Sequence, residues 1–227
     1  MFQDREQAAR RLADRLADHA GRGTVVAALA RGAVPMGCLL AEALDAELYV
    51  LVVRKIGAPG NRELAIGAIT DGEHPQTWLN HHLVQALGVT EAYIAEAVRR
   101  ETLELQRRKQ AYGADLRNPP LAGRTVIVTD DGIATGATMR MALAAVRRQR
   151  PARCILAVPV APPEALPALR EAVDEVICLE QPRPFGSVGQ HYLRFSQVDD
   201  DEVVRLLADF DRRRLPASRG AAGGGPA

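Results

Sequence analysis

The sequence predicts an α/β fold, a doubly wound and mostly parallel sheet with helices on both faces. Short runs of β-branched and other apolar residues recur along the chain, and segments of helical character separate them. Strands that are separated by helices pair in parallel through right-handed crossovers, which gives an open sheet covered on both sides. Ligands of such sheets bind outside the carboxyl ends of the strands, so functional residues are expected there.

The amino-terminal half alternates as this fold requires. Its first segment is an amphipathic helix that carries Ala8, Leu12 and Leu16 on one stripe. Its last segment is a long, highly charged helix, which Gly113 and the prolines at 119 and 120 bring to an end. The expected elements are a helix at 5–19, a strand at 24–30, a helix at 35–44, a strand at 47–53, a short strand near the sheet edge at 64–69, and a helix at 90–112.

The carboxyl-terminal half repeats the alternation. Residues 126–128 form a continuous β-branched run, as expected of a strand that is buried on both faces. The adjacent prolines Pro162 and Pro163 mark the beginning of another helix. The expected elements are strands at 125–129, 154–160 and 175–179, and helices at 137–149, after 162, and near 200–213.

Length and composition indicate one compact unit. A chain of 227 residues that is 47% hydrophobic and 25% charged can bury one sizeable core but not two full domains. We therefore expect a single domain over residues 1–215. The segment 216–227 is rich in glycine and is expected to be a disordered, low-complexity tail.

Charge and cysteine usage narrow the classes of function. A net charge of +1 argues against a nucleic-acid partner, since affinity for phosphate backbones needs an excess of Lys and Arg. No apolar run reaches the length of a membrane span, and the charged amino terminus lacks a signal-peptide core, so a cytoplasmic location is expected. Cys38, Cys154 and Cys178 lie far apart in apolar stretches, which indicates buried thiols rather than disulfides or zinc ligands.

The most informative segment, residues 126–138, reads VIVTDDGIATGAT. Its glycine–threonine turn follows a strand and precedes a helix, where unpaired N–H groups and the positive end of the helix dipole favour a phosphate. Gly136 lets the backbone approach such an anion, and the hydroxyls of Thr135 and Thr138 can donate hydrogen bonds to it.

Two adjacent acids, Asp130 and Asp131, come just before that turn. Ionised carboxylates only accept hydrogen bonds, which suits the vicinal 2′ and 3′ hydroxyls of a ribose. An Asp-Asp-Gly sequence before a Thr-Gly pair is also common in plain turns. The agreement of strand, turn and helix favours a ribose 5-phosphate pocket. The chain has neither a Gly-x-Gly-x-x-Gly nor a P-loop motif, so dinucleotide and P-loop sites lack their residues.

Two other strand ends carry positive charge. Arg31 and Gly32 follow the first predicted strand, and Arg54 and Lys55 follow the second. Either pair could be ordinary solvated residues, but a cleft with charges of one sign concentrates anionic substrates. We therefore expect these residues to face the same ligand as the acidic pair.

Together these features resemble the type I phosphoribosyltransferases, which use 5-phosphoribosyl 1-pyrophosphate (PRPP) with Mg²⁺. Most of residues 2–210 is similar to small stand-alone bacterial proteins that are described as predicted phosphoribosyltransferases. The segments that carry this resemblance are VVRKIGAPGN at 52–61, ELAIG at 63–67, DDGIATGATM at 130–139, VPVAPP at 158–163, and parts of 184–197.

The resemblance implies a role for each strand end. In the family, the loop after the first strand binds pyrophosphate and often holds a cis non-proline peptide, and the second strand leads into a mobile loop over PRPP. Ala33 departs from the usual Arg-Gly-Gly and leaves Gly32 as the only glycine of the first loop. The implied catalytic residues are Arg31, Lys55, Asp130 and Asp131, and the implied PRPP-binding residues are Gly32, Arg54, Asp130, Asp131, Ala134, Thr135, Gly136, Ala137 and Thr138.

The resemblance also implies partners. Mg²⁺ would bridge pyrophosphate and ribose oxygens and keep several waters, so no closed cage of protein ligands is expected. Pyrophosphate would leave as a nitrogenous acceptor attacks, and two chains would pair as a homodimer. The main alternative from another class is a PRPP-sensing regulator without catalysis, and a third possibility is an α/β domain with a vestigial site.

The acceptor is less well defined. Ala134 stands where hypoxanthine-guanine enzymes carry a carboxylate that faces the base, which disfavours a 6-oxopurine bound in that manner. The segment 182–192 lies where the family places a small hood over the acceptor. Phe185 in that segment could stack on a planar base, or it could be a hydrophobic plug. His74, His81, His82 and His191 show no metal-ligand spacing.

Overall fold

The computed structural model describes residues 1–70, 76–112 and 119–214. Its centre is a five-stranded sheet of order β2-β1-β6-β7-β8, in which every pair of neighbours is parallel. The five strands are β1 (Thr24–Leu29), β2 (Glu47–Leu51), β6 (Thr125–Thr129), β7 (Arg153–Val160) and β8 (Glu175–Glu180). This arrangement confirms the predicted class of fold, with β6 in the middle of the sheet.

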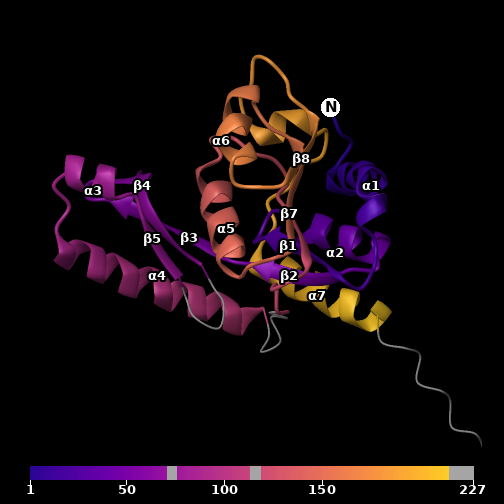
Figure 1. The fold of residues 1–227 in the computed structure, drawn as a ribbon, viewed down its shortest axis with the longest axis horizontal. Coiled ribbons are helices and arrows are strands. Elements are labelled where there is room, and N and C mark those ends of the chain that lie inside the picture. The colour runs from indigo at the N-terminus through magenta and orange to yellow at the C-terminus, as the bar shows by residue number, and fades with distance from the viewer. Residues whose placement is uncertain (71–75, 113–118, 215–227) are drawn as a thin grey trace, which may run out of the picture.

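Helices cover both faces of this sheet. Figure 1 shows α5 (Ala137–Arg148) and α6 (Leu166–Arg170) on one side, and α1 (Arg5–Arg15) and α2 (Val34–Ala43) on the other. The helix α7 (Asp200–Arg214) packs against α2. Strands β1, β6 and β7 are buried almost throughout, because layers of helix lie on both of their faces.

A second, antiparallel sheet projects from this body. It contains β3 (Val53–Ala58), β4 (Asn61–Thr70) and β5 (Gln76–Leu79), with β4 in the middle. The helices α3 (His81–Ala86) and α4 (Glu91–Ala111) follow it. We call β3, β4, β5, α3 and α4 the arm, which extends away from the parallel sheet in Figure 1. Helix α4 packs against β3 and β4, and α5 contacts the same two strands.

The arm corrects two predictions. The second strand does not run to Val53 but ends at Leu51, and β3 begins a new sheet at Val53. The strand expected at 64–69 near the sheet edge is longer, and it is the central strand of the arm. Gly60, which has a φ of +73°, forms the tight connection between β3 and β4. Turn residues such as Gly60 therefore marked a hairpin where a loop was expected.

The other predicted elements are confirmed to within a few residues, with 3₁₀ turns at Ala17–His19 and Pro163–Ala165 inside two of the predicted helices. The strands β3 and β5, the helix α3 and the 3₁₀ turn at Val188–His191 were not predicted. Cys38 and Cys154 are buried and Cys178 is half-buried, as their apolar surroundings indicated. Burial raises the pKa of the Cys38 thiol to about 12. None of the helices within 1–70, 76–112 and 119–214 is both long and apolar enough to cross a bilayer. The predicted tail at 216–227 lies outside the described residues.

Candidate active site

The predicted phosphate turn lies at the carboxyl end of β6. Gly136 precedes the first residue of α5 and has a φ of +76°, a left-handed conformation that favours glycine. Thr135, Ala137 and Thr138 are exposed around this helix end. The first N–H groups of an α-helix have no partner within the helix, so the turn can bind an anion in the predicted way. Ala134 is exposed in the same turn.

The two acids lie between the strand and this turn, and their environments differ. The backbone N–H of Asp131 donates to Oδ1 of Asp130 at 2.8 Å. Burial, and then the neighbouring charge of Asp131, raise the pKa of Asp130 well above its usual range. Burial also raises the pKa of Asp131, but the guanidinium of Arg5 opposes this effect. Among the described residues, Asp131 therefore has a counter-charge at hydrogen-bond distance and Asp130 has none.

Arg5 was not predicted as a residue of this site. Its Nε and Nη2 donate to Oδ2 of Asp131 at 2.9 and 2.7 Å, across 126 positions of sequence. The side chains are only 11% and 13% exposed, so this ion pair lies largely out of solvent. One charged residue among several in a first helical turn gives no sequence signal for such a contact.

The predicted pyrophosphate loop lies beside the same aspartate. The Ala30–Arg31 peptide is cis, as the family resemblance implied for this loop. A β-carbon on Gly32 would lie 2.6 Å from Oδ2 of Asp131, so the absence of a side chain at position 32 allows the close approach. Arg31 Nη1 lies 3.7 Å from Asp200 Oδ1, at the beginning of α7.

A cavity of about 350 Å³ opens where these groups meet. Its wall includes three arginines, Arg5, Arg31 and Arg108, and one acid, Asp131. Arg108 comes from α4, where its Nε donates to Glu104 at 3.1 Å. A cavity with this excess of guanidinium groups suits a multiply charged anion. Arg108 was not predicted, because its sequence neighbours are those of an ordinary charged helix.

The predicted residues Arg54 and Lys55 lie on opposite faces of β3, because side chains alternate along a strand. Arg54 faces α4, where its guanidinium donates to Glu101 at 2.8 and 3.1 Å. Lys55 lies in one cross-strand row with Ala68 and Trp78. Ala68 and Trp78 border a hollow against α5, so Lys55 belongs to the face that points toward α5. Arg54 and Lys55, which were predicted to face the same ligand, therefore point in opposite directions.

The predicted hood segment at 182–192 lies directly against the acidic turn. A β-carbon on Gly132 would lie 2.5 Å from Val188 Cγ1, so these two residues are in close contact. The hydroxyl of Tyr192 donates to the backbone carbonyl of Asp131 at 2.6 Å. Phe185 is half-buried, and its ring stacks on His191 with centroids 5.1 Å apart. One face of Phe185 is therefore already occupied by a side chain of this segment.

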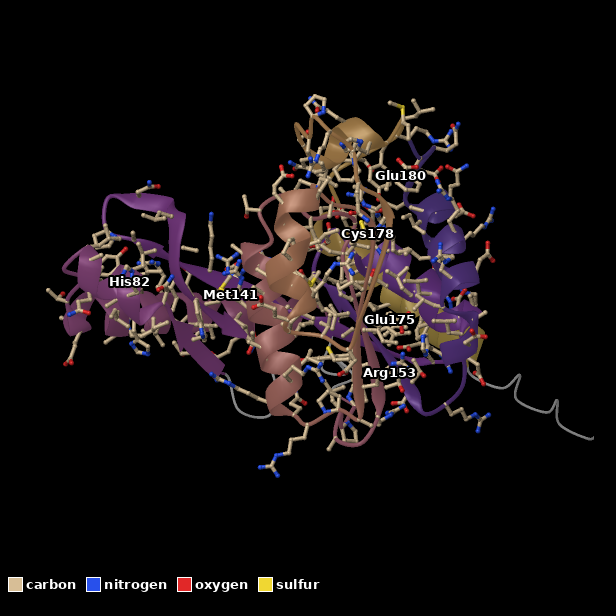
Figure 2. All side chains as sticks on the ribbon, turned by 45° about the horizontal axis from the view of Figure 1, so that its top comes forward. His82, Met141, Arg153, Glu175, Cys178 and Glu180 are labelled. Atoms are coloured by element: carbon tan, nitrogen blue, oxygen red, sulfur yellow. The ribbon has the colours of Figure 1, made fainter. Side chains whose placement is uncertain are left out.

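A second cavity, of about 220 Å³, lies between the phosphate turn, α5 and the arm. Thr135 and Ala137 border it on one side, Arg140 and Met141 of α5 on another, and Trp78 of the arm on a third. Figure 2 shows Met141 on the side of α5 that faces the arm, and His82 within the arm. The turn residues Thr135 and Ala137 therefore border a cavity that the acidic pair does not line.

The residues present fit a hydrated Mg²⁺ better than a tightly coordinated metal. Within 1–70, 76–112 and 119–214, no group of three or more His, Cys, Asp or Glu side chains could hold a metal ion. Asp130, a half-buried residue beside the turn, forms no ion pair with any described residue. Mg²⁺ commonly uses one or two carboxylates together with waters and phosphate oxygens of a substrate.

Comparison with known proteins gives consistent matches. The model of the phosphoribosyl transferase domain matches residues 2–193. A protein of Mycobacterium tuberculosis H37Rv named "Putative phosphoribosyl transferase Rv0571c" is 42% identical over 207 residues, and the CDC 1551 strain has a counterpart with the same values. The match covers 91% of this chain and 46% of those proteins, so the chain spans about half the length of these curated relatives.

A solved structure is also similar over most of the chain. TT1426 from Thermus thermophilus is 37% identical and superimposes with a TM-score of 0.80. The superposition covers 92% of this chain and 98% of TT1426. The similarity therefore includes the strands, the turn and the arm described above.

Proposed function

This chain belongs to the phosphoribosyl transferase domain family, and we propose that it transfers the ribose 5-phosphate of PRPP to a nitrogenous acceptor and releases pyrophosphate. The observation that carries the proposal is the order of groups at the end of β6. Two carboxylates, suited to ribose hydroxyls, are followed by a helix amino terminus suited to the 5-phosphate. Asp131 also borders the cavity with three arginines, and we place pyrophosphate there.

The reaction is a substitution at the anomeric carbon of the ribose. The bond from that carbon to pyrophosphate breaks, and a bond to the acceptor nitrogen forms through an oxocarbenium-like state. The enzyme must hold the ribose in line and neutralise the departing charge. In our proposal Asp130 and Asp131 hold the ribose hydroxyls, and the turn 134–138 holds the 5-phosphate. Arg31, which borders the cavity, stabilises pyrophosphate as it leaves. The family resemblance assigns Lys55 to the same task, although Lys55 does not border that cavity.

Mg²⁺ would contact the acidic pair through its waters, with Asp130 as the nearer candidate because Asp131 is already paired with Arg5. When bound, the ion would supply a Lewis acid for the pyrophosphate and ribose oxygens. Arg54 is the weakest of the proposed PRPP contacts, because Glu101 already accepts from its guanidinium.

The acceptor in this proposal is a nucleobase or a related planar nitrogen compound. The segment 182–192 reaches the acidic turn through Val188 and Tyr192, which supports its role as a hood. Phe185 would contact the acceptor with the ring face that His191 does not cover. We also propose that the protein is a cytoplasmic homodimer, and sedimentation of the purified protein would test the dimer.

The experiment for this function begins with PRPP binding. We expect calorimetry to detect Mg²⁺-dependent binding of PRPP to the wild type, and Asp130→Asn with Asp131→Asn to abolish it while the circular dichroism spectrum stays unchanged. The control is Asp14→Asn with Asp18→Asn, which removes the same charge from exposed positions of the first two helical segments. Unchanged PRPP affinity in the first double variant would refute the proposed site.

Catalysis needs a separate measurement. The wild type is incubated with PRPP, Mg²⁺ and a panel of nucleobases, and released pyrophosphate is measured. We expect release that depends on one class of base. PRPP binding without base-dependent release for the whole panel would favour the non-catalytic sensor over the transferase.

A further inference from the structure

The segment after the hood carries a motif that the proposed reaction does not use, Phe195-Ser196-Gln197. The structure places this motif against the first residues of the chain. The N–H of Phe2 donates to the carbonyl of His191 at 2.7 Å, and the N–H of Leu193 donates to the carbonyl of Phe2 at 2.9 Å. Residues 2–3 and 191–194 are thereby fastened side by side, and Arg5 comes to lie next to Phe195 and Ser196.

All three guanidinium nitrogens of Arg5 are engaged. Nε and Nη2 donate to Oδ2 of Asp131, and Nη1 donates to the carbonyl of Ser196 at 2.8 Å. The guanidinium carbon also lies 4.0 Å from the centre of the Phe195 ring. A planar group that is held on one face and at three nitrogens has little freedom to rotate. Its orientation, and with it that of the Asp131 carboxylate, is therefore fixed.

The remaining contacts of Asp131 belong to the same assembly. Tyr192 is buried, donates to the Asp131 carbonyl, and stacks on Phe195 with ring centroids 5.0 Å apart. Gly32 leaves the space that Oδ2 occupies. Both donors of Arg5 converge on Oδ2, which leaves Oδ1 of this carboxylate for a ligand hydroxyl.

We infer that Arg5 is a positioning residue for ribose recognition, which holds the Asp131 carboxylate in one orientation, and that the Tyr192–Ser196 segment holds Arg5. This inference rests on the proposed function, because it assigns the ribose hydroxyls to Asp131. The competing explanation is that Arg5 only fastens α1 to the sheet. A partly buried ion pair is weak evidence for stabilisation, so a separate measurement has to distinguish the two roles.

The test measures PRPP affinity by calorimetry with Mg²⁺, well below the melting temperature of each variant. Arg5→Met should weaken PRPP binding by about tenfold or more, the loss expected for hydrogen bonds to a charged group. Arg5→Lys, which keeps the charge but not the paired geometry, should lie between that variant and the wild type. Arg10→Met is the control, because Arg10 is exposed on the same helix and pairs only with Glu6 among the described residues.

A double-mutant cycle tests whether Arg5 acts through Asp131. In the Asp131→Asn background, Arg5→Met should cause little further loss of PRPP affinity, because the group that Arg5 positions is already altered. If Arg5→Met fails to fold, Arg5→Lys carries the same comparison. The inference is overturned if both Arg5 variants bind PRPP within about twofold of the wild type, or if the losses simply add. If the wild type binds PRPP and one of these two results is found, only the role of Arg5 is refuted and the proposed function is not. If the wild type binds no PRPP, the proposed function is refuted and this inference with it.

Discussion

The acidic turn and the arm hold their candidate residues by different means. Asp131 receives hydrogen bonds from Arg5 and Tyr192, which are 126 and 61 positions away, and Gly32 lies against the same carboxylate. Lys55 instead lies on a hairpin strand whose neighbours are β4 and the adjoining helices α4 and α5. The turn is therefore fixed by the whole parallel-sheet body, and the arm mostly by segments close to it in sequence.

The difference suggests a division of labour in the proposed reaction. The 5-phosphate and the ribose hydroxyls take no part in the exchange of bonds at the anomeric carbon, so a rigid turn in the centre of the sheet suits them. Pyrophosphate carries more charge as it departs, so the groups that stabilise it act most strongly in the transition state. A residue on the arm can serve that second task without a part in binding ribose 5-phosphate.

Lys55→Ala should have the largest effect and should act on turnover. If Lys55 meets pyrophosphate mainly as it leaves, kcat should fall by about 100-fold, the size found when one preorganised transition-state contact is removed. Binding of ribose 5-phosphate, measured by calorimetry, should stay unchanged. Arg99→Ala is the control for loss of a positive charge from the arm, since Arg99 is exposed on α4. Equal losses of turnover and ribose 5-phosphate affinity would end the division between the two regions.

Gly32→Ala should weaken PRPP binding, because it disturbs the acidic turn rather than the arm. The new β-carbon would lie 2.6 Å from Oδ2 of Asp131, which Arg5 holds in place, so the carboxylate or the loop must move. We expect a loss of PRPP affinity of about 2 kcal/mol, within the range for forcing an extra carbon into a packed site. Gly23→Ala is the matched control, because no atom lies within 4 Å of a β-carbon at that position. PRPP affinity equal to that of the control would mean that Asp131 is less rigidly held than its contacts indicate.

The two regions also differ in how far the sequence could predict them. The run 126–138 predicted its own strand, turn and helix, because each is determined by local signals such as β-branched residues and a glycine at positive φ. The arm was partly missed, since β5 is only four residues long and follows no alternation that distinguishes it from a loop. Arg5 and Arg108 could not be found at all, because a contact between distant residues leaves no mark on either local pattern. Arg54 and Lys55 were predicted to face the same ligand because both were placed just after the end of a strand. In the structure both lie within β3, where successive side chains point to opposite faces.

Phe185→Ala should have a smaller effect, confined to the acceptor. His191 already covers one face of the Phe185 ring, so at most one face remains for a base. We expect a loss of acceptor affinity of about 1 kcal/mol, at the lower end of the range for base–aromatic stacking. PRPP affinity should change little, and both are measured by calorimetry on the same preparation. Loss of PRPP affinity without loss of acceptor affinity would assign Phe185 to the support of the acidic turn and not to the hood.

Glu104→Gln should have the smallest effect, and its dependence on pH and salt sharpens the contrast between the regions. Hydrogen bonds from Arg107, and also from Arg108, lower the pKa of Glu104 in α4 to about 2. A carboxyl with a lowered pKa in the folded state stabilises that state above its unfolded pKa, near 4.5, and this contribution is lost as the pH falls toward 2. We therefore expect the substitution to lower the free energy of unfolding by about 0.5 kcal/mol at pH 7, and by less at pH 3.5.

Salt should weaken the ion pairs on α4 more than the pair between Arg5 and Asp131, because the pairs on α4 are more exposed. Urea unfolding of the wild type and Glu104→Gln at low and high NaCl should bring the two curves together as salt screens the arm. The loss of PRPP affinity in Arg5→Met, relative to the wild type at the same ionic strength, should change far less, because its ion pair lies largely out of solvent. Salt could instead reduce the stability loss in Glu104→Gln and the loss of PRPP affinity in Arg5→Met to the same degree. The acidic turn would then be held by exposed interactions like those of the arm, and the proposed difference between the two regions would be refuted.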